Sequence, residues 1–214
     1  MFKDRADAAL QLAQRLRHLE GEHPLVLAIP RGAVPMARLI ADALGGELDI
    51  VLVHKLGAPG NPEYAIGAVS ADGSVAISEQ GRALCSKDYI DREVGAQLRI
   101  LRARYRRYSV VRPPIDPSGR LVIVVDDGVA TGATMLAALQ ALRQREPRRL
   151  IAALGVAPPE TLRRIEAQAD AIACLAAPSP FFAVGQYFAD FRQVSDDEVV
   201  ELLGQGTGHG TTGA

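Results

Sequence analysis

The sequence lacks tryptophan, has only two cysteines and carries almost no net charge, with 24 Lys+Arg against 25 Asp+Glu in 214 residues. Cys85 and Cys174 form no C-x-x-C pair, so neither a zinc framework nor a disulfide scaffold is expected, and we predict a cytoplasmic location. The charge balance argues against a protein whose main task is to coat nucleic acid or an anionic membrane. No secretory leader and no apolar run of about 18 residues is visible, so we predict no targeting or membrane segment.

The residues present are 48% hydrophobic and 23% charged, which is enough apolar material for a sizeable core. Short apolar runs, each typical of a buried strand, alternate with patterns of helical spacing. The predicted strands are 25–29, 48–53, 121–125, 150–156 and 171–175, and the predicted helices are 3–20, a stretch reaching Leu44, 87–108, 131–144, 159–169 and 195–203. This alternation predicts an α/β fold of the Rossmann-like type: an open, mainly parallel sheet with helices on both faces.

Between the second and third of these strands the pattern changes. Residues 55–62 are rich in turn formers and are expected to form a mobile loop. Residues 65–70 and 74–77 are predicted to form a β-hairpin, because the Asp72-Gly73 pair tolerates the positive φ of a tight turn.

We expect a single domain over 1–203, with a core of about 21–177 and a flexible tail over 204–214 that is rich in Gly and Thr. Residues 178–194 differ in character, because they hold four of the five phenylalanines of the chain. They are expected to form a small subdomain, to which the N-terminal helix could contribute. Its aromatic rings could be a local core or a platform for a flat ligand, and both interpretations stay open for Phe182.

The strongest chemical signal follows the strand at 121–125. Asp126 and Asp127 stand at its carboxyl end and precede a loop of small residues and a helix. An isolated Asp-Asp-Gly is usually a simple turn, but ligands of open α/β sheets bind at this edge, and free amides at a helix N-terminus suit a phosphate. The loop therefore predicts a phosphate site, and the neighbouring carboxylates suit hydroxyl groups or a divalent cation. Together they match a ribose 5-phosphate.

Residues 123–135, IVVDDGVATGATM, resemble the phosphoribosyl pyrophosphate (PRPP) signature of type I phosphoribosyltransferases. The resemblance extends over about residues 25–192. The segment 30–33, Pro-Arg-Gly-Ala, is similar to the pyrophosphate loop of that family, and Lys55 is similar to its basic residue at the end of the next strand. Residues 56–66 resemble its flexible loop, and residues 181–191 more weakly resemble the hood of purine-salvage members.

The resemblance implies a Mg²⁺-dependent phosphoribosyltransferase that moves the phosphoribosyl group of PRPP to a nitrogenous base. Asp126 and Asp127 would hold the ribose hydroxyls, directly or through water or Mg²⁺, and Asp127 could also accept a proton. Arg31 and Lys55 would neutralise the leaving pyrophosphate. The remaining residues implied to bind substrate are Gly32, Ala33, Val129, Ala130, Thr131, Gly132, Ala133, Thr134 and Phe182. A homodimer is compatible with the family, although no residue pattern requires one.

Two features depart from this pattern. The strand at 150–156 ends without the Lys or Arg that purine-salvage members commonly carry there, which argues against an oxopurine acceptor. A run of arginines with no acid between them also occurs, at positions Arg99, Arg102, Arg104, Arg106, Arg107 and Arg112. Such a run is usually a solvated helix face, which is the favoured interpretation. The alternative hypothesis is a PRPP-sensing regulator of the same fold that binds RNA through these arginines.

Overall fold

The computed structural model describes residues 1–108 and 113–205. Its centre is a parallel sheet of five strands in the order β2-β1-β6-β7-β8. The strands are β1 (Leu25–Ala28), β2 (Glu47–Ile50), β6 (Leu121–Gly128), β7 (Arg149–Val156) and β8 (Ala171–Ala176). The predicted α/β class and parallel sheet are confirmed.

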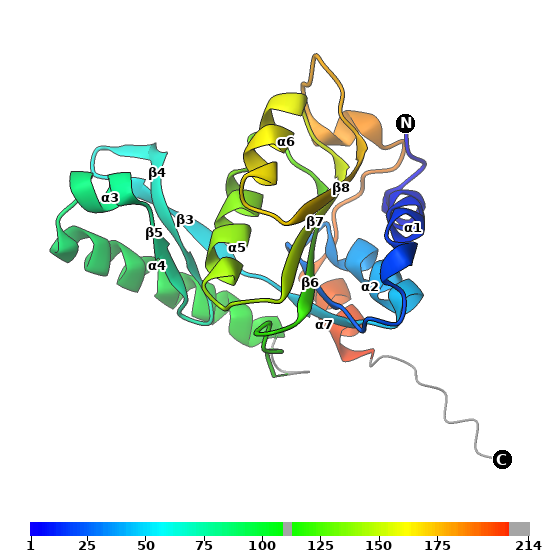
Figure 1. Cartoon of the computed structure of the whole chain (residues 1–214), viewed down its shortest axis with the longest axis horizontal. Helices are drawn as coiled ribbons and strands as arrows, with labels where there is room; N and C mark the ends of the chain where they lie inside the picture. The colour runs from blue at the N-terminus through cyan, green and yellow to red at the C-terminus, as the bar shows by residue number, and fades with distance from the viewer. Residues whose placement is uncertain (109–112, 206–214) are drawn as a thin grey trace.

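Helices cover both faces of this sheet (Figure 1). One face packs against α1 (Arg5–Arg15) and α2 (Val34–Leu44), with a 3-10 turn at Arg17–Leu19 after α1. The other face packs against α5 (Ala133–Arg143) and α6 (Pro159–Glu166). Neighbouring residues of β6 point to opposite faces, so Val124 joins one core cluster and Val125 the other. Both side chains are fully buried, which explains the continuous apolar run of this strand.

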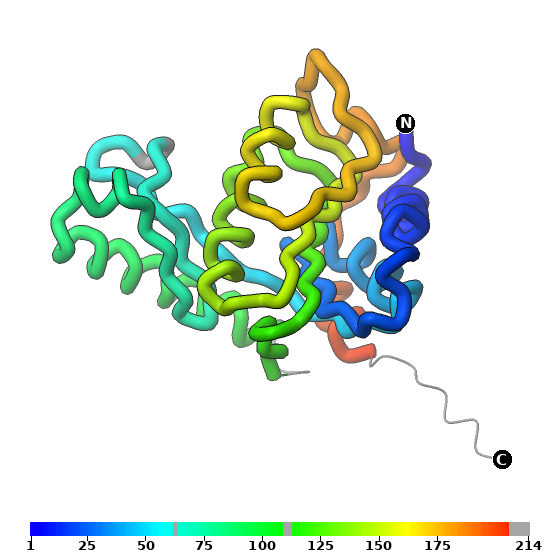
Figure 2. The backbone as a smooth tube through the Cα atoms, viewed as in Figure 1, coloured from blue at the N-terminus to red at the C-terminus, as the bar shows by residue number. Residues whose placement is uncertain are grey.

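A second sheet extends from one side of the main body, as the tube in Figure 2 shows. It is antiparallel and contains β3 (Val53–Ala58), β4 (Asn61–Ser70) and β5 (Val75–Ile77). The chain then forms α3 (Glu79–Leu84) and the long helix α4 (Lys87–Tyr108), whose predicted bounds are confirmed. The turn between β4 and β5 is also as predicted, with Gly73 at φ +96° and the Asp72 carboxylate accepting from the amide of Ser74 at 2.9 Å.

The loop predicted at 55–62 is wrong, whereas the resemblance of residues 56–66 to the flexible loop of the family stays a prediction. These residues form the β3–β4 hairpin instead, while the strand predicted at 48–53 ends at Ile50. Gly60, at φ +73°, supports the connecting turn, and Leu56 and Ile66 on its two sides are fully buried. Pro59 and Gly60 therefore mark one tight turn between two strands.

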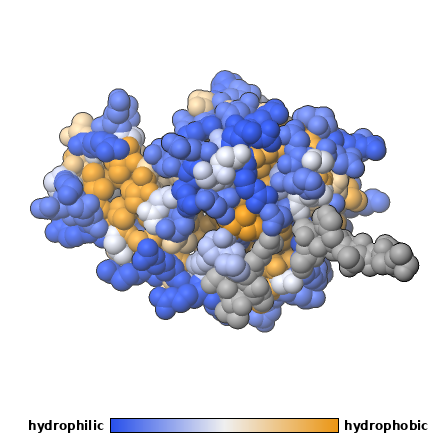
Figure 3. Space-filling model, turned by 60° about the horizontal axis from the view of Figure 1, so that its bottom comes forward, coloured by the Kyte–Doolittle hydropathy of each residue, from blue (hydrophilic) through white to orange (hydrophobic). Residues whose placement is uncertain are grey.

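Apolar surface gathers over this second sheet and α4 on the face that Figure 3 presents. Leu84 on α3 and Ile100 on α4 are 64% and 62% exposed. The extension therefore buries its apolar residues less completely than the main body does.

The last described segment returns along the carboxyl edge of the main sheet. It contains a 3-10 turn at Val184–Tyr187 and the helix α7 (Asp196–Gly204), which Ser195 caps by accepting from the amide of Glu198 at 3.1 Å. Phe2 pairs with Phe188 in an isolated parallel bridge, so the N-terminus lies against this segment. Most of the predicted tail lies outside the described residues. Among the helices described, none has both the length and the apolar character needed to cross a bilayer.

Candidate functional site

The two predicted acids lie where the carboxyl ends of β1 and β6 run side by side. Ala28 is paired with Val125, so the loop after β1 continues beside Asp126 and Asp127. The side chains of successive strand residues alternate, which directs Asp127 toward the face covered by α1 and α2 and Asp126 toward the face covered by α5 and α6. Asp127 is buried and Asp126 is half-buried.

Both carboxyl groups are harder to ionise than usual. Burial raises the pKa of Asp126 well above its ordinary value, and the neighbouring charge of Asp127 raises it further. Burial also raises the pKa of Asp127, while hydrogen bonding to Arg5 opposes that rise. Oδ1 of Asp126 accepts a hydrogen bond from the amide of Asp127 at 2.9 Å. Two adjacent ionised carboxylates repel each other, so a nearby cation is needed to keep both acids ionised.

Arg5 supplies that cation, and no sequence pattern points to it. Its Nε and Nη2 atoms each lie 2.8 Å from Oδ2 of Asp127. The two residues are 122 positions apart, and Arg5 begins an ordinary amphipathic helix. Only its place on α1, which packs on the same face as Asp127, brings the pair together.

Two side chains of α6 donate hydrogen bonds to the loop between β6 and α5. The carbonyl of Ala130 accepts from the Thr161 hydroxyl at 2.7 Å, and the carbonyl of Thr131 accepts from Nη1 of Arg164 at 3.1 Å. In a trans peptide unit the C=O and N–H bonds point in opposite directions. The amides of Thr131 and Gly132 therefore point away from α6, toward the open edge of the sheet.

Gly132 completes this turn as the N-cap of α5. Its φ of +72° lies in the left-handed region, and a Cβ on it would lie 2.6 Å from Cγ2 of Thr161. The first amides of α5 add their own partial positive charge. The side chains of Thr131 and Thr134 are exposed, whereas Ala133 is half-buried. Amides, helix dipole and hydroxyls thus meet at this turn, which is the combination of groups that suits an anion.

Val129 differs from the rest of the predicted phosphate set. Its side chain is buried, and its amide donates to the carbonyl of Val156 at 2.9 Å. That amide belongs to the sheet edge, so residues 130–134 are the better candidates for binding a phosphate.

The predicted pyrophosphate loop packs against Asp127. Gly32 comes so close that a Cβ on it would lie 2.3 Å from Oδ2 of Asp127. Ala33 is buried as the N-cap of α2, and the peptide between Pro30 and Arg31 is cis. The Arg31 side chain is exposed, with Nη1 lying 3.9 Å from Oδ1 of Asp196 on α7.

Lys55 does not follow a strand of the main sheet. It lies within β3, paired with Ala68, and its side chain is half-buried. The expectation that it ends the second parallel strand is therefore wrong, because the chain starts the antiparallel sheet only a few residues after β2 ends at Ile50.

The aromatic residues of the 178–194 segment pack mainly with one another. Phe181 stacks with Tyr187 at 5.5 Å between ring centroids, and Phe188 stacks with Phe191 at 5.0 Å. Phe182 is the exception, because its side chain is 74% exposed. The cluster is a local core with one ring left at the surface.

The arginines of α4 are at the surface. Arg99, Arg102, Arg104, Arg106 and Arg107 are exposed, and Arg112 lies outside the described residues. Arg107 is held at 3.0 Å by Asp196, the acid that also faces Arg31. The helix is therefore solvated along its basic side, as the favoured interpretation of the sequence expected.

Comparisons with known proteins give one consistent picture. The family model for the phosphoribosyl transferase domain matches residues 3–189. Two provisionally named phosphoribosyl transferases from two strains of Mycobacterium tuberculosis, Rv0571c and MT0597, are each 42% identical over 95% of this chain. The chain spans about half of their length, 46% in each case. The crystal structure of TT1426 from Thermus thermophilus is similar over 97% of this chain and 99% of its own, with 45% identity and a TM-score of 0.92.

Proposed function

Because the chain belongs to the phosphoribosyl transferase domain family, we propose that it transfers the 5-phosphoribosyl group of PRPP to a nitrogenous base in a Mg²⁺-dependent reaction. In this reaction the bond between ribose C1 and the pyrophosphate oxygen breaks. A bond from C1 to a nitrogen of the base forms, and that nitrogen loses its proton. Positive charge develops on the sugar as pyrophosphate leaves, so the protein must hold the sugar and neutralise the leaving group.

The observation that carries this proposal is the geometry of the turn at 130–134. Thr161 and Arg164 hold its carbonyls toward α6, so its amides face the strand edge beside Asp126 and Asp127. Amides at a helix N-terminus favour a dianionic phosphate, and nearby carboxylates favour hydroxyls. A ribose 5-phosphate carries both groups at opposite ends of a small sugar. The turn would bind its phosphate, and the acids would bind its diol.

The acids also fit a Mg²⁺ ion. Magnesium prefers carboxylate and phosphate oxygens and usually takes several ligands from its substrate. Oδ1 of Asp126 accepts from the amide of Asp127, and Oδ2 of Asp127 accepts from Arg5, so one oxygen of each acid is already engaged. Asp126 and Asp127 would therefore both serve as protein ligands, directly or through water. When bound, the ion would add positive charge at the pyrophosphate and the diol.

The pyrophosphate would lie against the loop at 30–33, with Arg31, Gly32 and Ala33 on one side and Lys55 as a further cation. Arg31 is exposed, and among the described residues it faces one acid, Asp196, at 3.9 Å, so it can turn toward a phosphate. Phe182 is our candidate for stacking on the base, because it is the ring of its cluster that remains largely exposed. Burial raises the pKa of Asp127 despite the hydrogen bond from Arg5, so proton acceptance by Asp127 stays part of the proposal.

The test is pyrophosphate release from PRPP and Mg²⁺ with a panel of purine and pyrimidine bases, measured after coupling to inorganic pyrophosphatase. We expect base-dependent release that Asp126→Asn and Thr131→Ala each abolish. Calorimetry with PRPP and Mg²⁺ should show binding that the same variants weaken. Absence of PRPP binding would refute the proposal. Tight binding of intact PRPP with no turnover, together with salt-sensitive RNA binding, would instead support the regulatory alternative.

A further inference from the structure

Arg5 joins three separate parts of the molecule around one carboxylate. Its Nε and Nη2 atoms lie 2.8 Å from Oδ2 of Asp127, and its Nη1 donates to the carbonyl of Arg192 at 2.6 Å. The guanidinium carbon lies 3.9 Å from the centre of the Phe191 ring. The side chain is only 13% exposed. One residue of α1 is thus fixed by a strand end and by the 178–194 segment at once.

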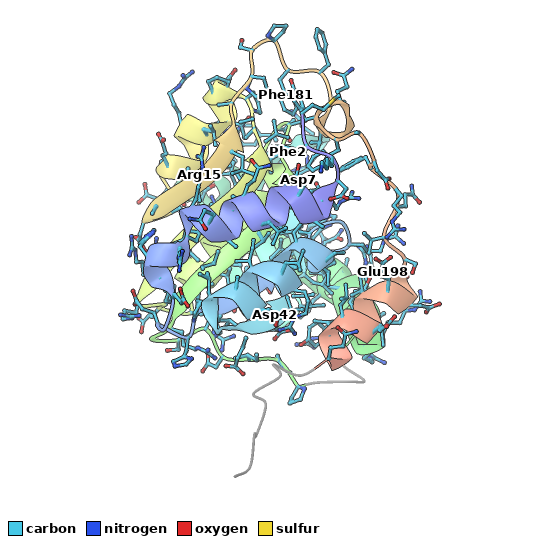
Figure 4. The ribbon with its side chains drawn as sticks, turned by 90° about the vertical axis from the view of Figure 1, so that its right-hand side faces the viewer. Phe2, Asp7, Arg15, Asp42, Phe181 and Glu198 are labelled. Atoms are coloured by element: carbon cyan, nitrogen blue, oxygen red, sulfur yellow. The ribbon has the colours of Figure 1, made fainter. Side chains whose placement is uncertain are left out.

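The ring under Arg5 is itself held in place from the N-terminus. Phe191 stacks with Phe188, whose ring is tilted against Phe2 at 5.1 Å. The amide of Phe2 donates to the carbonyl of Tyr187 at 2.8 Å, and the carbonyl of Phe2 accepts from Ala189 at 2.9 Å. Figure 4 shows Phe2 between the start of α1 and the loop that carries Phe181. The guanidinium therefore rests on a rigid aromatic support.

Oδ2 of Asp127 is enclosed from two sides. Arg5 approaches this oxygen with two N–H groups. Gly32 packs so close on the other side that a Cβ on it would lie 2.3 Å from Oδ2. The side chain of Asp127 is 12% exposed. A planar guanidinium with a fixed fork defines the orientation of a carboxylate better than a flexible ammonium can. Arg5 thus fixes the orientation of the Asp127 carboxylate through Oδ2.

We propose that Arg5 is a positioning residue for the transfer: it fixes Asp127 through Oδ2 in the orientation in which the carboxylate would bind the ribose diol of PRPP. This inference rests on the proposed function. Arg5 does not touch the reacting atoms, and its effect passes through Asp127. Its ties to Arg192 and Phe191 also make correct placement of the acid depend on the 178–194 segment.

A purely structural role for Arg5 would predict something different. It would lower stability without changing the dependence of PRPP binding on Asp127. A double-mutant cycle separates these cases, because only residues that act through one another give non-additive effects. The cycle uses Arg5→Ala, Asp127→Asn and the double variant. Arg15→Ala is the matched control, since Arg15 lies on the same helix and also donates to a carbonyl, that of Cys174 at 2.6 Å.

The dissociation constant of PRPP with Mg²⁺ is measured by calorimetry, and the KM values of PRPP and acceptor are measured separately. Arg5→Ala should weaken PRPP binding at least about tenfold, which matches the loss of one charge-assisted hydrogen-bonded pair. The acceptor KM should change less than about threefold, and Arg5→Ala should add little once Asp127→Asn is present. Arg5→Lys should restore part of the loss.

If Arg5→Ala does not fold, Phe191→Leu serves in its place. This variant removes the ring that supports the guanidinium and leaves the ion pair between Arg5 and Asp127. It should also weaken PRPP binding, but by less than Arg5→Ala. Additive effects, or an Arg5→Ala variant that binds PRPP as Arg15→Ala does, overturn the role of Arg5 and leave the proposed function standing. A wild-type protein that does not bind PRPP overturns both.

Discussion

The substitution Gly132→Ala tests whether the turn at 130–134 requires glycine for two separate reasons. The residue has φ +72°, a conformation that side chains with a Cβ rarely adopt. A new methyl group would also lie 2.6 Å from Cγ2 of Thr161, far inside the optimal carbon separation of about 3.5–4.0 Å. The two effects are independent, so each can be removed by its own control.

The expected loss of stability follows from these two terms. The left-handed conformation costs roughly 1–2 kcal/mol for a residue with a Cβ. Overpacking against a buried neighbour costs about 1–3 kcal/mol more. The sum, about 2–5 kcal/mol, corresponds to a fall in melting temperature of roughly 4–20 °C for a domain of this size. The proposed phosphate site should lose affinity as well, because the same turn directs its amides.

Two variants isolate the terms. Gly119 has φ +67°, and a methyl group added to it would meet nothing within 4 Å, so Gly119→Ala carries only the conformational term. Thr161→Ser removes the γ-methyl group and keeps the hydroxyl that donates to Ala130, so it should recover the steric part of the Gly132→Ala loss. Urea and thermal unfolding measure all of these. Equal losses for Gly132→Ala and Gly119→Ala, or no recovery with Thr161→Ser, would refute the reasoning.

Three further outcomes are expected. Ser195→Ala should lower the free energy of unfolding by about 1 kcal/mol, because its hydroxyl caps α7, and Ser195→Asp should restore it; equal stability in urea would contradict the cap. Arg143 lowers the pKa of Asp170, so this acid stabilises the fold above its unfolded pKa of about 3.9 and loses that effect as pH falls through the lower folded value. The difference in free energy of unfolding between wild type and Asp170→Asn, measured in urea, should therefore be present at neutral pH and shrink in acid. A difference that does not change with pH would contradict this role of the ionised Asp170. Asp196→Asn should release Arg31 and tighten PRPP binding about 1.5- to 5-fold, as expected for an exposed ion pair, and weaker binding in calorimetry would reverse that assignment.

Local patterns predicted the parts of the fold whose cause is local. The helix at Lys87–Tyr108 follows from regular apolar spacing, and the turn at Asp72-Gly73 follows from the φ that glycine allows. The strand before Asp126 is an unbroken apolar run because both of its faces are covered. The same strand end located the candidate site, since the carboxyl edge of a parallel sheet is where ligands bind.

What could not be predicted depends on contacts between distant segments. The hairpin of β3 and β4 was mistaken for a loop, because Pro59 and Gly60 are equally typical of either, and only the burial of Leu56 distinguishes them. The pairing of Arg5 with Asp127 leaves no trace in spacing or composition. The exposed position of Phe182 likewise depends on which neighbouring rings fill the local core.

The placement of Arg5 has a consequence for the order in which the chain matures. A ribosome makes α1 well before the ring that supports the guanidinium, because Phe191 is 186 positions further along the chain than Arg5. Until that ring emerges, Arg5 and Asp127 can meet only without their aromatic cover. The acid that we assign to the sugar therefore acquires its final surroundings only after the 178–194 segment has been synthesised. Nascent chains halted before residue 191 should hold the central sheet and still lack a finished pocket.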